Sequence, residues 1–259
     1  MKKLSVVLSL GFALVWGNTV LAQNMPAGVL VSTVDCKLNA GITMPQAVAW
    51  ARNQPRNGPQ PGLEFYRFAQ VNAGFLENYD FRIAQYFQGF DHMVQVVSST
   101  AGMPANRVQP AVRATDLYTC DPATRSVATN RTVNTDNDGF TGQVTLMHTR
   151  FCVLEEGETL ADAWNFVRAV NANYREAGNN SLMQLYNREI GPVGNMQIAG
   201  RGVVIAAVPA TVQDWGQRMD MGRDGFRALE GVTSPFAACN YPAVWLTHAT
   251  YRSQQAQAQ

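Results

Sequence analysis

Histidine supplies the first candidates for chemistry in this 259-residue chain, because only three are present: His92, His148 and His248. An imidazole can move a proton near neutral pH, or bind a metal ion or haem iron. His148 and His248 fall in strand-like segments of the second half of the chain, and each is a candidate base or axial ligand. His92 begins a helical pattern and is most simply a surface residue.

The expected strand register keeps the two strand histidines apart. If the first and last strands of the second half pair so that Cys152 faces Cys239, then His148 faces Ala243. His248 then lies five residues away, roughly 17 Å along the strand. Only a five-residue slip would let the imidazoles share a metal, ligand or proton. The register therefore favours two separate, half-buried histidines over a paired site.

Aromatic residues indicate a binding surface more strongly. In the expected strand 243–251, Trp245 and His248 lie on opposite faces, because successive side chains alternate. One face must cover helices and the other must meet the first half of the chain. A pocket between the halves, lined by Trp245 or by the histidines together with Tyr186, is the expected ligand site. A filled core is the simpler alternative.

Recognised catalytic motifs are missing from the sequence. It contains no Gly-x-Ser-x-Gly elbow, no His-Glu-x-x-His pair and no Walker-type loop. The sequence therefore predicts no catalytic residue, no metal site and no cofactor. Without Lys2 and Lys3, 18 of the 20 basic residues remain against 19 acidic ones, which argues against nucleic-acid binding.

Four cysteines occur in a pattern that appears twice. Cys36 and Cys152 each begin a Cys-x-Leu-x-x-Gly-x-Thr motif, and each is followed far downstream by another cysteine, Cys120 or Cys239. A tandem duplication favours the disulfides Cys36–Cys120 and Cys152–Cys239, because a single ancestral copy would have closed its own loop. Four free thiols are one alternative. A zinc site is another, although no two cysteines have the close spacing that zinc sites show.

The N-terminus predicts export. Lys2 and Lys3 precede a short apolar run, and the small residues before Gln23 suit cleavage after Ala22, so residues 1–22 are read as a signal peptide. We expect a bacterial periplasmic or secreted protein, with no membrane span after cleavage. An oxidising compartment agrees with two disulfides.

Each half of the mature chain has the same order of expected elements: strand, helix, two strands, helix, strand. We place the halves at 24–133 and 143–252, with a linker at 134–142 and a disordered tail at 253–259. Thr43 and Thr159 suit helix N-caps, each with a side chain three residues later that completes a capping box. This order is that of the ferredoxin-like unit, an α+β fold.

The doubled cysteine motif and this order of elements resemble the dimeric α/β-barrel superfamily. The sequence is also similar to uncharacterised exported bacterial proteins with a related cysteine and helix-start pattern. The resemblance implies two fused ferredoxin-like (βαββαβ) repeats packed as a pseudo-dimeric α/β barrel. Members of the superfamily include cofactor-free oxygenases, haem proteins and plain ligand-binding modules.

The main functional expectation is an exported, disulfide-braced module that binds an unknown small ligand or protein partner without catalysis. The alternative is a cofactor-free oxygenase-like or haem-binding enzyme that uses the cavity between the repeats, with His148 or His248 as base or axial ligand.

Overall fold

The computed structural model describes residues 25–56, 58–71, 78–101, 112–133, 142–191 and 200–253. The first half contains β1 (Val29–Leu38), α1 (Met44–Arg52), β2 (Leu63–Val71), β3 (Phe81–Phe87), α2 (Phe90–Ala101), α3 (Ala114–Leu117) and β4 (Tyr118–Thr132). The second half contains β5 (Val144–Leu154), α4 (Leu160–Glu176), β6 (Leu182–Ile190), β7 (Gly202–Val208), α5 (Val212–Arg223), β8 (Phe236–Cys239) and β9 (Ala243–Arg252).

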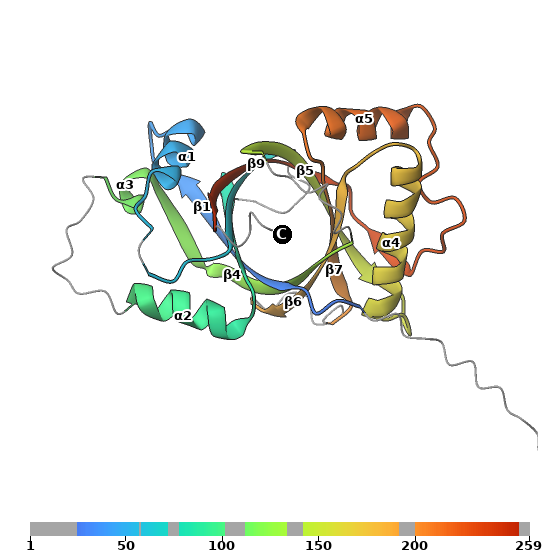
Figure 1. Ribbon diagram of the computed structural model, residues 1–259, viewed down its shortest axis with the longest axis horizontal. Helices are drawn as coiled ribbons and strands as arrows, with labels where there is room; N and C mark the ends of the chain where they lie inside the picture. The colour runs from blue at the N-terminus through green and yellow to red at the C-terminus, as the bar shows by residue number, and fades with distance from the viewer. Residues whose placement is uncertain are drawn as a thin grey trace, which may run out of the picture.

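Eight of the strands close into an antiparallel barrel, seen end-on in Figure 1. Their order is β7-β6-β4-β1-β3-β2-β9-β5, and β5 pairs with β7 to complete the circle. The halves meet at two seams, β2 with β9 and β4 with β6. Because each seam joins one strand from each half, the interior is lined by both. The expected α+β class and barrel are confirmed.

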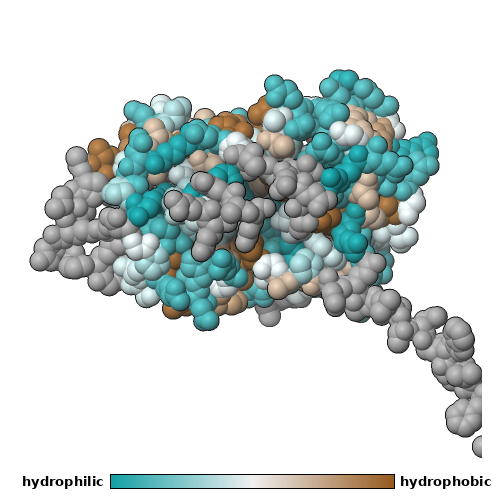
Figure 2. Space-filling model, in the orientation of Figure 1, coloured by the Kyte–Doolittle hydropathy of each residue, from teal (hydrophilic) through white to brown (hydrophobic). Residues whose placement is uncertain are grey.

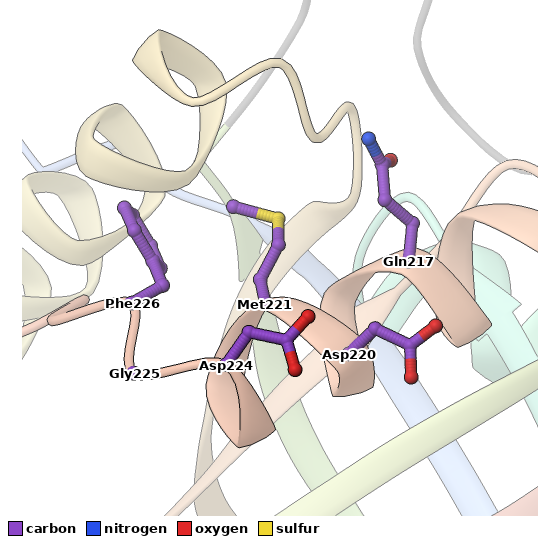
Figure 3. A pocket seen from close by; sticks show the side chains of 6 residues that line it. All are labelled: Gln217, Asp220, Met221, Asp224, Gly225 and Phe226. Atoms are coloured by element: carbon purple, nitrogen blue, oxygen red, sulfur yellow. The ribbon is translucent and has the colours of Figure 1, made fainter.

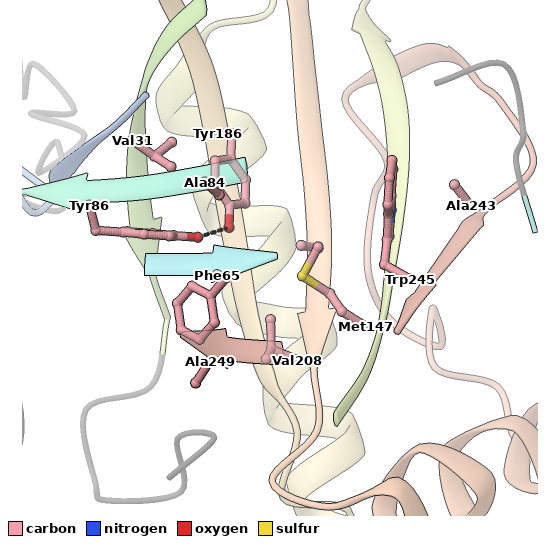
Figure 4. Close-up of a cluster of buried hydrophobic side chains, with 11 residues drawn as sticks. Val31, Phe65, Ala84, Tyr86, Met147, Tyr186, Val208, Ala243, Trp245 and Ala249 are labelled. Atoms are coloured by element: carbon pink, nitrogen blue, oxygen red, sulfur yellow. Dashed lines mark hydrogen bonds between the residues drawn. The ribbon is translucent and has the colours of Figure 1, made fainter. Parts of the chain in front are cut away.

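Both faces of the barrel wall are buried, which explains why the strands are apolar on both sides. One cluster of side chains lies inside the barrel and draws on both halves, as Figure 4 shows. Its buried members are Val31, Phe65, Ala84, Tyr86, Met147, Tyr186, Ala206, Val208, Ala243, Trp245 and Ala249. Three further clusters lie outside, where α1 and α2 cover the first half and α4 covers the second.

The expected turns and caps place these helices on the outer face. Gly41 and Gly157 adopt φ of 79° and 91°, a left-handed conformation that glycine reaches without strain. The backbone N–H of Thr43 donates to Gln46 Oε1 at 2.8 Å, and that of Thr159 donates to Asp162 Oδ2 at 2.8 Å. The helices α1 and α4 therefore start at corresponding points after β1 and β5.

Each half carries one disulfide that joins its first strand to a neighbouring strand, β1 to β4 in the first half and β5 to β8 in the second. Cys36 and Cys120 are register partners with an S–S distance of 1.97 Å. Cys152 and Cys239 are register partners with an S–S distance of 2.01 Å. These are the pairs expected from the repeated motif, and no free cysteine occurs in the part of the chain that the structure describes.

The final strand of the second half, β9, matches the expected strand 243–251, but the register expected from the cysteine pair does not continue along it. Residues 240–242 separate β8 from β9, and Pro242 has no N–H to offer a ladder. The break shifts the register by one residue, so His148 faces Val244 rather than Ala243. The short elements α3 and β8 were not expected.

Three of the sequence predictions fall on residues that the structure does not describe: the signal peptide 1–22, the linker 134–141 and the tail from residue 254. Among the helices that are described, none combines the length and apolar character needed to cross a membrane.

Candidate functional site

The barrel interior contains a chain of polar side chains that begins at Arg67 on β2. Its Nη2 donates to the hydroxyl of Tyr86, on the adjacent strand β3. The Tyr86 and Tyr186 hydroxyls lie 3.0 Å apart, and this contact joins the two halves of the barrel (Figure 4). Tyr186 in turn donates to Gln184 Oε1. A cation is thus linked through two phenols to an amide, all inside the barrel.

Arg67 is a buried cation without a counter-ion. Its side chain is 7% exposed, and no carboxylate pairs with it among the described residues. Its Nε is buried and has no hydrogen-bond partner. Burial lowers the pKa of Arg67, but the hydroxyls of Tyr86 and Tyr186 outweigh burial and leave this pKa above its usual value. The guanidinium therefore stays charged inside the barrel.

The interior tyrosine Tyr186 stays neutral. Burial, followed by the neighbouring Tyr86, raises the pKa of the Tyr186 hydroxyl well above its usual range, although Arg67 lowers it in part. This hydroxyl therefore keeps its proton at physiological pH. A neutral hydroxyl orients Arg67 without cancelling its charge, so the positive field remains available to a ligand.

A second arginine inside the barrel is paired. Arg82 on β3 donates from Nε to Asp35 Oδ1 at 2.6 Å and from Nη2 to Asp35 Oδ2 at 2.9 Å. Its guanidinium carbon lies 5.6 Å from the ring centroid of Trp245. The indole N–H of Trp245 donates to Thr149 Oγ1 at 2.8 Å. This bidentate pair holds one wall of the barrel and contrasts with unpaired Arg67.

Of the four predicted ligand-binding residues, the structure brings Tyr186 and Trp245 into the interior. Both belong to the interior cluster, and they are 8% and 2% exposed. Tyr186 lies on β6 and Trp245 lies on β9, and each of these strands forms one of the two seams between the halves. Both side chains therefore lie inside the barrel, and their role in binding a ligand stays a prediction.

The two histidines do not share that space. His148 lies on the outer face of β5, near Arg218 of α5, and His248 lies on the outer face of β9, with its ring 5.9 Å from that of Phe68. Burial, then Arg218 and Arg150, lowers the pKa of His148 to about 3. Burial lowers the pKa of His248 as well, and Arg52 adds to this. Both imidazoles are neutral and covered by helices.

These positions bear on the two cofactors considered from the sequence. Since His148 and His248 face outward, neither fits as an axial ligand to a haem held inside the barrel. His92, on α2, accepts a hydrogen bond at Nδ1 from the backbone N–H of Gln88, and its Nε2 donates to the backbone carbonyl of Gln60. In the described ranges, no three His, Cys, Asp or Glu side chains gather as metal ligands.

The molecular surface has a hollow at the end of α5. Figure 3 shows this pocket, of about 770 Å³, lined by Gln217, Asp220, Met221, Asp224, Gly225 and Phe226. It is wide open and belongs to the outer layer of the second half. The face seen along the barrel axis carries hydrophilic and hydrophobic residues interspersed (Figure 2). Neither feature is as specific chemically as the interior around Arg67.

Sequence reasoning missed Arg67, Tyr86 and Gln184. A signal was present, because Arg67 lies between Phe65 and Ala69 on a face of the strand that is otherwise apolar. An arginine on such a face is buried only for a reason.

Comparison with known proteins identifies no family by sequence: no family model and no curated protein matches the chain. Solved structures with a similar fold include an anthrone oxidase-like protein, at 11% identity over 88% of this chain and 95% of that one, with a TM-score of 0.42. They also include a putative monooxygenase from Lactobacillus acidophilus, at 9% identity over 86% and 94%, with a TM-score of 0.44. A chlorite dismutase from Candidatus Nitrospira defluvii matches at 9% identity over 86% and 92%, with a TM-score of 0.45.

These findings correct the main functional expectation. The sequence favoured a non-catalytic binding module, whereas the structures that match are an oxidase-like protein, a monooxygenase and chlorite dismutases. The prediction of a module without catalysis is therefore wrong, and the comparison favours its alternative. The absence of a catalytic motif was the reason for that expectation.

Proposed function

We propose that this chain is a cofactor-free oxygenase-like enzyme that binds an enolisable or phenolic substrate inside the barrel. The observation that carries the proposal is the buried Arg67 guanidinium, which has no carboxylate partner among the described residues and keeps a free Nε. A buried cation favours any ligand that arrives with, or develops, a negative oxygen.

Arg67 would act by stabilising the substrate oxyanion. Loss of a proton from an enol or phenol leaves charge on oxygen, and a fixed cation in a water-poor site lowers the energy of that anion. Tyr86 accepts a hydrogen bond from the guanidinium and orients it. The contact between the Tyr86 and Tyr186 hydroxyls joins the two halves, and Tyr186 donates to Gln184 on its own strand. The electron-rich anion then reduces dioxygen. For anthrone as substrate, one CH₂ becomes C=O, and the second oxygen atom leaves as water.

The proposal is tested by dioxygen consumption with anthrone as the probe, because this polycyclic ketone enolises to a phenol. We expect the protein to accelerate oxidation above the spontaneous rate, with anthraquinone as product. Replacing Arg67 by Met keeps volume and removes the charge, and we expect it to reduce kcat/KM about 100-fold or more, as loss of an oxyanion donor does.

The matched control is Arg223→Met, which removes the same charge from an exposed position on α5. It should leave the rate unchanged. A rate equal to spontaneous oxidation with anthrone and with simpler phenols, or an Arg67→Met variant as active as wild type, would refute the proposal.

We further propose that the two halves, 24–133 and 143–252, are ferredoxin-like repeats produced by duplication. Two observations support this. The strand order within the first half is β4-β1-β3-β2 and within the second is β9-β5-β7-β6, the same order relative to the chain. Each half also carries one disulfide from its first strand, to β4 in the first half and to β8, just before the last strand, in the second.

We propose an oxidising compartment, periplasmic or extracellular, as the place of action, with residues 1–22 as the export signal. The two disulfides support it, because such bonds form and persist outside the cytosol. Cell fractionation with an intact-mass measurement tests it. Mature protein that starts at Gln23 in the periplasm or medium is the expected result, and full-length protein in the cytoplasm would contradict it.

A further inference from the structure

The helix α5 contacts the barrel in an unusual way, because its one buried residue is an arginine. Arg218 is 3% exposed, while the other residues of α5 are exposed or half-buried. The helix lies on the outer side of the second half, beside α4 (Figure 1). An amphipathic helix normally turns apolar side chains inward. Here a guanidinium takes that position, against the outer face of β5 and β6.

The neighbours of Arg218 do not neutralise its charge. Its guanidinium carbon lies 3.4 Å from the ring centroid of Tyr174 on α4, and Nη2 lies 3.5 Å from the sulfur of Met183 on β6. Among the described residues no carboxylate pairs with it. Both remaining nitrogens, Nε and Nη1, are buried without a hydrogen-bond partner. Burial of such a charge is costly unless something negative accompanies it.

Other buried polar atoms without hydrogen-bond partners belong to the same layer. Trp215 lies one turn before Arg218 on α5, and its indole Nε1 is buried without a partner. His148, beneath the helix on β5, is close enough to feel the charge of Arg218, and its Nδ1 is also buried without a partner. Indole and guanidinium N–H groups only donate. The layer between α5 and β5 therefore has an excess of donors and of positive charge.

We propose that a small monovalent anion, of halide or formate size, binds between α5 and the outer face of β5, held by Arg218 and Trp215. The anion accepts hydrogen bonds from Arg218 Nε and Nη1 and from Trp215 Nε1, and it supplies the negative charge that no described side chain provides. A water molecule satisfies donors but leaves the cation uncompensated. This site is separate from Arg67, because the barrel wall lies between them.

The pocket at the end of α5 is not the anion site itself. Its rim carries Asp220 and Asp224, whose charges repel an anion. Its Phe226, however, packs 5.2 Å from the ring of Tyr174, which in turn covers Arg218. Tyr174 therefore lies between Phe226, which lines the pocket, and the guanidinium of Arg218.

Chemical unfolding at constant ionic strength tests the proposal. Sodium gluconate, whose anion is too large for a buried site, is replaced stepwise by sodium chloride or by sodium formate. A ligand at 100 times its Kd lowers the unfolding constant about 100-fold. We expect the unfolding constant of the wild type to fall as chloride or formate rises. The effective anion distinguishes a halide site from a carboxylate site.

Three variants separate this effect from general salt effects. In Arg218→Met the dependence should disappear, and in Trp215→Phe, which keeps the ring and removes one donor, it should weaken several-fold. Arg223→Met removes an exposed charge from the same helix and should behave as wild type. Equal dependence in all four proteins, or none in the wild type with either anion, would overturn the proposal.

Crystals grown with sodium bromide provide a direct readout. An anomalous peak within hydrogen-bond distance of Arg218 Nη1 and Trp215 Nε1 supports the site. A water molecule at that point, with bromide only at the surface, refutes it.

Discussion

The molecule buries two arginines without carboxylate partners among its described residues, one on each side of the barrel wall, and they are held differently. Arg67, inside, donates to Tyr86, and hydroxyl groups keep its pKa above the usual value. Arg218, outside, lies against a tyrosine ring and a thioether, and burial lowers its pKa to about 10, with Tyr174 offsetting only part of the effect. The contrast shows that burial alone does not determine what a guanidinium can do. The groups that accept hydrogen bonds from the guanidinium decide what it can do.

The largest expected effect is a loss of folding stability at acidic pH. It should come from His148, which lies beside Arg218, and it sharpens the contrast between the two arginines. The pKa of His148 is about 3 when folded and about 6.5 when unfolded, so the unfolded chain binds more protons in between. Stability is therefore full above pH 6.5 and falls as the pH drops toward 3, by roughly 3 kcal/mol at pH 4. Urea unfolding from pH 7 to pH 4 measures it.

His148→Gln serves as the comparison for that slope. It cannot acquire a proton, so the part of the acid sensitivity that comes from this residue should vanish. If wild type and variant lose stability in parallel, His148 is protonated in the folded state as the pH falls. The surroundings of His148 and Arg218 then tolerate the imidazolium charge better than the burial of His148 indicates.

A smaller effect should separate the two tyrosines that touch the arginines. Tyr86→Phe removes the hydroxyl that accepts from Arg67 and leaves a buried charged donor unpaired, which costs about 1 to 3 kcal/mol. Tyr174→Phe keeps the ring over Arg218 and should cost less than about 0.5 kcal/mol. Thermal unfolding of both variants measures the difference. Equal losses would mean that the two arginines are held alike.

The smallest effect should come from Arg218→Met in gluconate buffer. Removal of a buried cation that lacks a partner, with an apolar residue of similar length in its place, is expected to change stability by about 1 kcal/mol or less, and an increase is as acceptable as a decrease. Loss of about 3 to 5 kcal/mol in urea unfolding would instead reveal a broken ion pair. The comparison with Arg67 would then fail.

Local pattern was sufficient to predict most of the fold. Aromatic and other apolar residues in segments such as 63–71 mark strands, and Thr43 and Thr159 mark helix starts, because these signals depend only on neighbouring residues. The cysteine pairs followed from the repeat. All of these features are local or are repeated in the chain, so a single sequence contains them.

The site was harder, because it depends on which face of each strand turns inward. Alternation along the strand placed Trp245 and His248 on opposite faces. It did not say which face is the inner one, because both faces of the barrel wall are apolar and covered. Nothing in the alternation distinguishes the inner face from the outer. The break at residues 240–242 then moved the register of His148 by one residue, an effect of three residues that no periodic pattern reveals.

Joining the two halves in one polypeptide has a consequence for the interior. Arg67 is the fifth residue of β2 and Tyr186 is the fifth residue of β6, and each of these strands forms a seam with the last strand of the other half. A pair of identical subunits around a twofold axis would have to place the same residue at both points. Two arginines there would repel each other, and two tyrosines would lack the cation. A single chain is not bound by that symmetry. Its strand β2 can therefore provide the charge while β6 provides the phenol that orients it.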